Sequence, residues 1–183
     1  LQTDNTKQIT DDGKKNEIIN GSTDWVYEEE FSLTKAFFWS PDSRRIAFMR
    51  FDESEVKEYN MQKWNNVSLY PEDYKFKYPK AGEANSVMAV KIFDIEESEF
   101  INVNLGKETD IYIPRVQWTK NNTLLSILRL NRLQNKLDVM HADARTGSAE
   151  VVFTDRSRTF IDMNYVDDLT YLNDGRYFLI SSE

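Results

Sequence analysis

A strand–turn–strand unit that occurs three times limits the fold of this chain most strongly. In its first copy, Ala36-Phe37-Phe38-Trp39 is a predicted strand and Ser40-Pro41-Asp42-Ser43 suits a type I turn, because proline presets the backbone angle at the second turn position. Residues 45–51 then form a second apolar strand. The layout returns over residues 116–128 and 170–180. This recurrence predicts an all-β repeat fold such as a β-propeller, although three divergent copies also fit other antiparallel β proteins.

The spacing of the three copies predicts an insertion. Trp39 and Trp118 are 79 residues apart, whereas Trp118 and Tyr171 are 53 residues apart. A propeller blade of the WD type takes about 40–45 residues. We therefore interpret residues 52–86 as an insertion within a blade.

One apolar segment is ambiguous between helix and strand. Residues 124–133 contain leucines at a spacing that a helix would also allow. The dipeptide Asn121-Asn122 marks a turn directly before them, which favours a strand that continues to Leu130.

The predicted insertion carries an aromatic face. Tyr74, Phe76 and Tyr78 alternate with lysines, which is the period-two pattern of a strand, and Tyr70 lies shortly before them. Aromatic side chains exposed on an extended segment favour a surface that binds a partner. A hairpin folded onto its own sheets is the alternative.

An acidic string, Asp24-Trp25-Val26-Tyr27-Glu28-Glu29-Glu30-Phe31, interrupts the β pattern. Asp24 suits a helix N-cap, since its carboxylate can accept from the free N–H groups of a first turn. Carboxylates within that turn are favoured by the helix dipole. Residues 24–30 are therefore predicted to be one or two helical turns, anchored by Trp25 and Tyr27. Taken alone, the string could be only a solvated acidic turn beside two core aromatic residues.

The same string resembles the double-glutamate motif of the dipeptidyl peptidase IV family, which are serine exopeptidases of the prolyl oligopeptidase type. The resemblance continues through Trp39-Ser40-Pro41-Asp42, Tyr78-Pro79-Lys80-Ala81-Gly82 and Gln134-Asn135. It implies that residues 1–183 are three to four blades of an N-terminal β-propeller, with the helical turns at 24–30 as an insertion.

The resemblance also implies roles for individual residues. Glu29 and Glu30 would hold the free amino terminus of a peptide substrate, whose N-terminal dipeptide is then removed. The residues that would support this site are Asp24, Trp25, Tyr27 and Glu28. Residues 58–78 would form an arm that mediates a homodimer through Tyr70, Tyr74, Phe76 and Tyr78. The alternative within the same family is a non-enzymatic propeller that binds proteins.

Two neighbouring carboxylates suit this task physically. A peptide amino terminus has three N–H donors, and hydrogen bonds between charged partners are about twice as strong as neutral ones. Carboxylates that are held close repel each other, and a cation between them relieves the repulsion. A pair such as Glu29 and Glu30 therefore requires a protonated, unblocked amine, and at a fixed distance from a nucleophile it would restrict cleavage to a short N-terminal piece.

The chain lacks the other chemistry of a serine peptidase. No Gly-x-Ser-x-Gly elbow is present, and the single histidine, His141, lies in a predicted strand, where we expect a structural role. We therefore expect no catalytic residue here, a triad on an α/β-hydrolase domain elsewhere in a longer protein, and no hydrolysis by this piece alone. With no cysteine and one histidine, neither a metal nor another cofactor is expected.

The charge of the chain restricts its partners. Its net charge of −8, from 23 basic and 31 acidic residues, argues against nucleic acid, which requires a basic surface. No apolar run approaches the roughly 20 residues of a membrane span. The polar start at residues 1–4 does not fit a signal peptide. The resemblance alone implies an extracytoplasmic location, in the periplasm or cell envelope of a bacterium.

Overall fold

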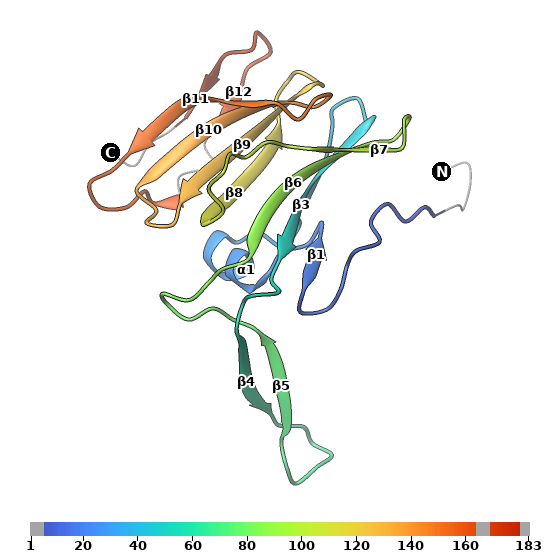
Figure 1. The fold of residues 1–183 in the computed structure, drawn as a ribbon, viewed down its shortest axis with the longest axis vertical. Helices are drawn as coiled ribbons and strands as arrows, with labels where there is room; N and C mark the ends of the chain where they lie inside the picture. The colour runs from blue at the N-terminus through green and yellow to red at the C-terminus, as the bar shows by residue number, and fades with distance from the viewer. Residues whose placement is uncertain (1–5, 164–168, 180–183) are drawn as a thin grey trace.

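The computed structural model describes residues 6–163 and 169–179, and strands dominate it (Figure 1). Two antiparallel sheets form the body, and they confirm the prediction of an all-β, partial propeller. The first sheet contains β1 (Ile18–Asn20), β2 (Phe37–Trp39), β3 (Arg45–Asp52), β6 (Val87–Asp94) and β7 (Glu99–Asn102). The second contains β8 (Ile111–Trp118), β9 (Leu124–Asn131), β10 (Lys136–Asp143) and β11 (Ala149–Arg156).

The second sheet is a meander in which each strand pairs with the next. The segment that was ambiguous in the sequence is β9, a strand whose buried leucines pair on one side with β8 and on the other with β10. A short hairpin follows, made of β12 (Thr170–Tyr171) and β13 (Tyr177–Phe178). Ile180, the end of the third predicted unit, lies outside the described residues.

In the first sheet, one edge is interrupted by a helical excursion. Both β1 and β2 pair with β3, and their registers meet at Met49. The N–H of Gly21 donates to the carbonyl of Met49 at 3.0 Å, and the N–H of Met49 donates to the carbonyl of Ala36 at 2.9 Å. β1 and β2 therefore act as one strand that residues 22–35 leave and rejoin. These residues contain the only helix among the described residues, α1 (Trp25–Phe31).

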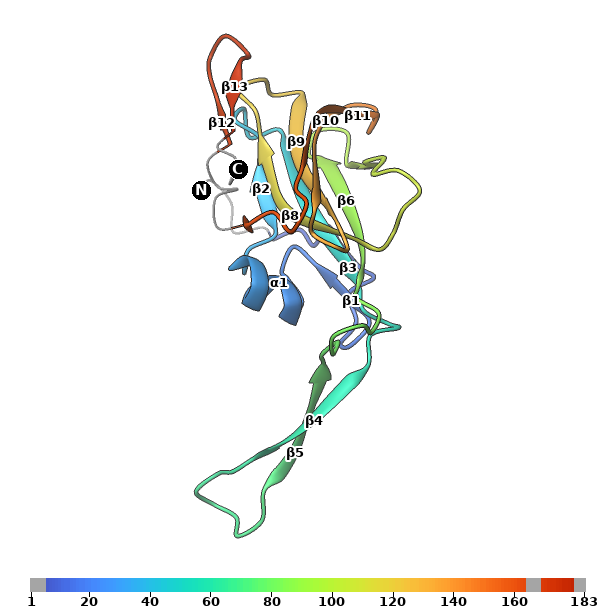
Figure 2. The same ribbon diagram turned by 90° about the vertical axis from the view of Figure 1, so that its left-hand side faces the viewer.

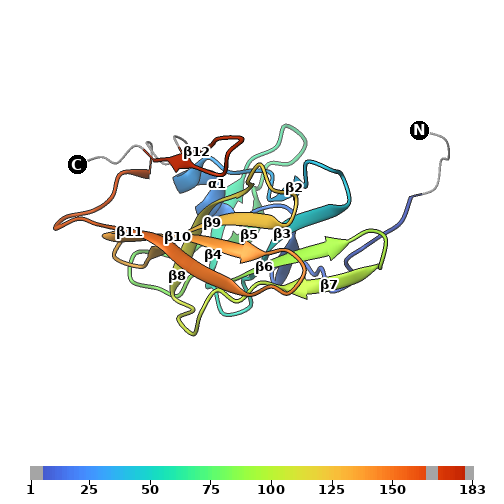
Figure 3. The ribbon, with the colours of Figure 1, turned by 90° about the horizontal axis from the view of Figure 1, so that it is seen from above.

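The core lies between the two sheets, whose strands run beside each other when viewed from above (Figure 3). The first sheet contributes fully buried residues such as Met49 and Phe51, and the second contributes Ile113 and Ile127. Buried residues of α1 belong to the same cluster. Burial of apolar area at about 25 cal/mol per Å² therefore couples the helix to both sheets.

A hairpin extends away from this body (Figures 1 and 2). It consists of β4 (Glu58–Lys63) and β5 (Glu72–Lys77), which pair over their full length, and it lies within residues 52–86. Every residue of β4 is exposed. The hairpin does not fold back onto the two sheets. It extends from the same end of the sheets at which α1 lies. Among the described residues, no helix has the length and hydropathy to cross a membrane.

Candidate functional site: an acidic helix held by both sheets

Asp24 caps the first turn of α1, as its sequence position predicts. Its Oδ1 accepts from the backbone N–H of Tyr27 at 3.0 Å, and its Oδ2 accepts from the hydroxyl of Ser86 at 2.6 Å. The residue is only 7% exposed. Burial raises the pKa of the Asp24 carboxyl above its usual value, while the bonds from Ser86 and Tyr27 offset part of that effect. The cap thus ties the start of α1 to the segment that enters β6.

Tyr27 fastens the middle of the helix to the second sheet. Its hydroxyl accepts from the backbone N–H of Ile113 at 2.7 Å. The register between β8 and β9 shifts between Tyr112 and Arg115, so Ile113 and Pro114 form a bulge, where a ladder bond is missing. Tyr27 supplies the acceptor there. Complete burial raises the pKa of this hydroxyl well above its usual value, so it stays neutral.

The last turn of the helix is held from the second sheet as well. The guanidinium of Arg115 donates from Nη1 to the carbonyl of Phe31 at 2.9 Å. A cation at this end complements both the free carbonyl groups and the negative end of the helix dipole. Ser32 ends the helix in the left-handed conformation, at φ 51°.

The three glutamates point in different directions because successive residues of a helix are about 100° apart. Glu28 lines a cavity at the base of the arm, whereas Glu30 lines a cavity on the other side of α1. Glu29 lies between them in the helix. All three are exposed, and none makes a hydrogen bond or ion pair with another residue in the described part of the chain.

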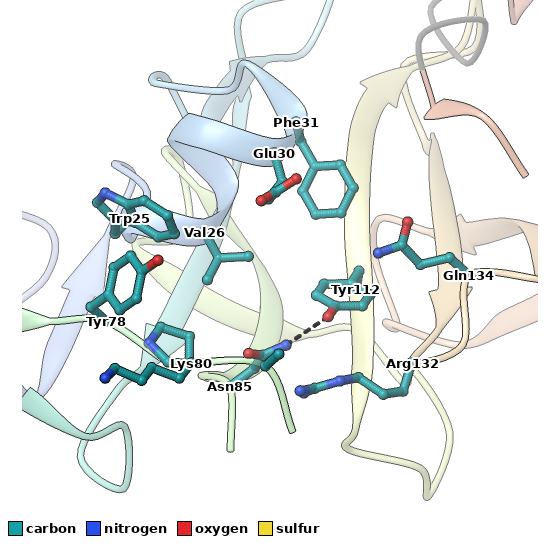
Figure 4. Close-up of a pocket in the computed structure, with 12 residues that line it drawn as sticks. Trp25, Val26, Glu30, Phe31, Tyr78, Lys80, Asn85, Tyr112, Arg132 and Gln134 are labelled. Carbon is teal, nitrogen blue, oxygen red and sulfur yellow. Dashed lines mark hydrogen bonds between the residues drawn. The ribbon is translucent and has the colours of Figure 1, made fainter. Parts of the chain in front are cut away.

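The cavity beside Glu30 has a volume of about 290 Å³ and is drawn in Figure 4. Trp25 packs against Tyr78 along one side, with ring centroids 4.2 Å apart. On another side, the Asn85 amide donates to the Tyr112 hydroxyl at 2.9 Å. The remaining lining residues are Val26, Phe31, Pro79, Lys80, Ala81, Arg132 and Gln134. Glu30 therefore borders a concave surface with both aromatic and hydrogen-bonding groups.

Asn85, Tyr112 and Arg132 line this cavity, but the sequence patterns did not identify them. Arg132 bonds Asp110 at 3.2 Å and the carbonyl of Glu83 at 2.8 Å. Two of these residues lie within three positions of motifs that carry the family resemblance, at 78–82 and 134–135. Proximity to those motifs is the signal that would have found them.

The residues expected to form the arm separate into two groups. Tyr70 lies at the tip and is 79% exposed, and Tyr74 on β5 is 51% exposed. Phe76 on β5 contacts Tyr78 at the base of the arm. Tyr78 therefore does not belong to the free end of the hairpin, and it lines the cavity beside Glu30.

His141 lies on β10, away from the acidic helix. Its Nε2 is 2.8 Å from the hydroxyl of Tyr171, which donates to Ser126 at 2.8 Å. Burial lowers the pKa of His141. These contacts join the second sheet to the hairpin that follows it. Within residues 6–163 and 169–179, no cluster of three or more His, Cys, Asp or Glu side chains is arranged to hold a metal ion.

Taken together, these features define part of a β-propeller in which a short helix, inserted between β1 and β2 at a sheet edge, carries exposed glutamates. Comparison with known proteins identifies the family. The model of the dipeptidyl peptidase IV N-terminal region matches residues 1–183, and the chain belongs to that family.

Individual relatives agree with this assignment. A probable dipeptidyl-aminopeptidase B of Coccidioides posadasii is 37% identical over 177 residues, covering 90% of this chain and 19% of that protein. The venom dipeptidyl peptidase 4 of Apis mellifera is 26% identical over 166 residues, covering 85% of this chain and 21% of its own. The crystal structure of Porphyromonas gingivalis dipeptidyl peptidase 4 superposes with a TM-score of 0.90 at 38% identity, covering 96% of this chain and 25% of that one. The chain thus spans about a fifth to a quarter of these relatives.

Proposed function

We propose that the complete protein containing this chain is a serine-type dipeptidyl peptidase, and that Glu29 and Glu30 bind the protonated amino terminus of its peptide substrate. The relatives are named as dipeptidyl peptidases, which supports the activity. The observation that carries the residue assignment is the position of these two glutamates. They are exposed on a helix fixed at both ends, with no ion pair to any described residue.

The helix geometry favours Glu29 and Glu30 over the pair Glu28 and Glu29. Glu30 borders the cavity walled by Tyr78, Asn85 and Tyr112, which offers apolar contact and hydrogen bonds to the first residue of a peptide. Glu28 faces the base of the arm. An ammonium group that contacts Glu30 can also reach Glu29 on the adjacent helix position, but not Glu28, about 200° away around the axis.

Substitution of each glutamate in the complete protein tests this proposal. We expect Glu29→Gln and Glu30→Gln each to lower kcat/KM for a dipeptidyl p-nitroanilide with a free amine. The loss of one charged hydrogen bond costs about 1.5–3 kcal/mol, or roughly 10- to 150-fold. Glu28→Gln is the matched control and should stay within about threefold of the parent.

An N-acetylated substrate provides the complementary measurement. It carries no ammonium group, so it should be turned over poorly by the parent, and Glu29→Gln and Glu30→Gln should cost it little further activity. Near-normal turnover of the free-amine substrate by both variants would end the assignment. If the complete protein hydrolyses neither substrate, the non-enzymatic alternative is favoured. The chain of residues 1–183 alone should be inactive, because it contains no nucleophile elbow.

We also propose that the arm joins two copies of the complete protein. The tip carries apolar side chains that are almost fully exposed, with Val67 at 95% and Leu69 at 92%. Exposed apolar groups on a projecting hairpin are typical of a surface covered by a partner. The double change Tyr74→Ser and Phe76→Ser should shift a dimer toward monomer in sedimentation. An unchanged dimer would place the interface elsewhere.

A further inference from the structure

A second cavity lies on the opposite side of α1 from the one beside Glu30, at the base of the arm. Its volume is about 370 Å³. Three carboxylates and three aromatic rings line it, together with one lysine. Its lining residues are Asn16, Ile19, Thr23, Asp24, Trp25, Glu28, Glu53, Met61, Tyr74, Phe76 and Lys77. The proposed amine site of Glu29 and Glu30 shares only Trp25 with it.

Glu53 is the unusual member of this group. The residue is only 6% exposed, yet its carboxylate makes no hydrogen bond or ion pair with any other residue that the structure describes. The Glu53 oxygens are not among the fully buried side-chain atoms that lack a partner, so they reach the surface of the cavity. Burial raises the pKa of Glu53, the charge of Asp24 raises it further, and the charge of Lys77 lowers it. The side chain is thus an unused acceptor in the wall of a cavity.

Of the other charged groups that line the cavity, Lys77 and Asp24 are already engaged, whereas Glu28 is an acceptor only. The amino group of Lys77 donates to the carbonyl of Val56 at 2.6 Å and to that of Ser54 at 3.2 Å, not to a carboxylate. Asp24 uses both oxygens, on Tyr27 and Ser86. Among residues 6–163 and 169–179, no side chain therefore donates to Glu53.

Aromatic rings form the other walls. Trp25 comes from α1, and Tyr74 and Phe76 come from β5, with ring centroids 5.6 Å apart in the β5 pair. A cation is attracted to an aromatic face within about 6 Å of its centroid. The amino group of Lys63 already lies 5.9 Å from the Tyr74 centroid. Aromatic rings and an unpaired carboxylate that line one cavity together are the chemistry that recognises an organic cation.

We propose that this cavity binds the cationic end of an alkylammonium or alkylguanidinium group, with Glu53 as its hydrogen-bond acceptor. The ligand class covers lysine and arginine side chains of a peptide as well as free polyamines. A divalent metal ion fits less well, since both oxygens of the Asp24 carboxylate are occupied and no metal cluster is found among the described residues. The inference does not rest on the proposed function.

Calorimetric titration of the complete protein tests this site. Nα-acetyl-lysine amide, which has no free α-amine, should bind, whereas Nα-acetyl-norleucine amide, which has the same apolar stem without the charge, should not. Putrescine separates a free polyamine from a peptide side chain, and the tighter of the two probes identifies the source. Equal binding of the lysine and norleucine derivatives, no binding of any amine, or tighter binding of calcium ion would each overturn the proposal.

Variants locate the binding. Glu53→Gln preserves the shape of the side chain and should weaken binding of the lysine derivative about 10- to 150-fold. Tyr74→Ala, at an exposed position on the arm, should also weaken it, and sedimentation of this variant separates that effect from a change of the proposed dimer. Glu29→Gln should leave it unchanged while it lowers peptidase turnover. Unchanged binding in both Glu53→Gln and Tyr74→Ala would exclude this cavity, and binding lost in Glu29→Gln alone would move the cation to the amine site.

Discussion

Removal of the Tyr27 hydroxyl tests how the acidic helix is positioned. In Tyr27→Phe, the ring keeps its contacts with Phe31 and Phe51, whose centroids lie 5.1 and 4.9 Å away. Only the oxygen that accepts from the Ile113 N–H is lost. Because Ile113 is fully buried and lies in a bulge of β8, neither water nor a neighbouring strand replaces that acceptor.

The expected cost follows from that geometry. A buried N–H that loses its partner costs about 1–3 kcal/mol. Local opening of α1 should become more favourable by this amount, so amide exchange in residues 25–31 should accelerate about 5- to 150-fold. Tyr27 touches no substrate in this proposal. Loosening of α1 should still lower kcat/KM for a free-amine substrate, because catalysis depends steeply on the position of the groups that hold the substrate.

Hydrogen exchange followed by mass spectrometry of the complete protein gives the measurement. Tyr112→Phe is the matched control, since its hydroxyl accepts from Asn85 at the border of a cavity that solvent can enter, and a smaller change of about 0.5 kcal/mol is expected. If Tyr27→Phe exchanges no faster than Tyr112→Phe across α1, then packing alone holds the helix and the reasoning is wrong.

Further substitutions test the cap of α1 and a tight turn. Burial raises the pKa of Asp24 in the folded state, so the folded protein binds more protons and its stability falls as pH rises from about 3.8 through the raised pKa. In urea unfolding between about pH 4 and 7, Asp24→Asn should remove this fall in the free energy of unfolding. Asp24→Ala should lose about 1 kcal/mol, because the helix cap is removed. If Asp24→Asn keeps the pH profile of the parent, Asp24 is not the group that causes the fall. Gly147→Ala should lower the unfolding temperature more than Gly175→Ala. Both glycines have positive φ, but only at Gly147 would a Cβ collide with a backbone carbonyl, that of Asn102; equal losses would show that the clash relaxes.

Local signals predicted the elements of this fold well. Asp24 and the carboxylates behind it predicted a helix at 24–30, and α1 ends one residue later, at Phe31. The spacing of Trp39 and Trp118 predicts an insertion at 52–86, which stays a prediction, and the projecting hairpin lies within those residues. The helix follows from capping and the strands follow from periodicity, both of which act within a few residues.

The contacts that position the site could not be predicted in the same way. The bond from Ile113 to Tyr27 joins residues 86 positions apart, and the bond from Ser86 to Asp24 joins residues 62 apart. Nor does any local pattern reveal that β1 and β2 form one edge. Pro114 was an available signal, because proline inside a strand indicates a bulge or an edge, and a bulge leaves a donor that some other element must satisfy.

The way α1 is attached explains why its glutamates remain available. The helix has seven residues, too few to be stable alone, so tertiary contacts must hold it. The segment that contains the helix is fixed on both sides by backbone bonds to Met49 of β3. The helix itself is bonded through Ser86, Ile113 and Arg115. These contacts use the cap, one buried tyrosine and the final carbonyl, and none uses a glutamate. A helix that relied on its own side-chain ion pairs would have consumed those carboxylates. Because long-range contacts hold this one, Glu29 and Glu30 make no ion pair with any described residue, which is what the proposed amine site requires.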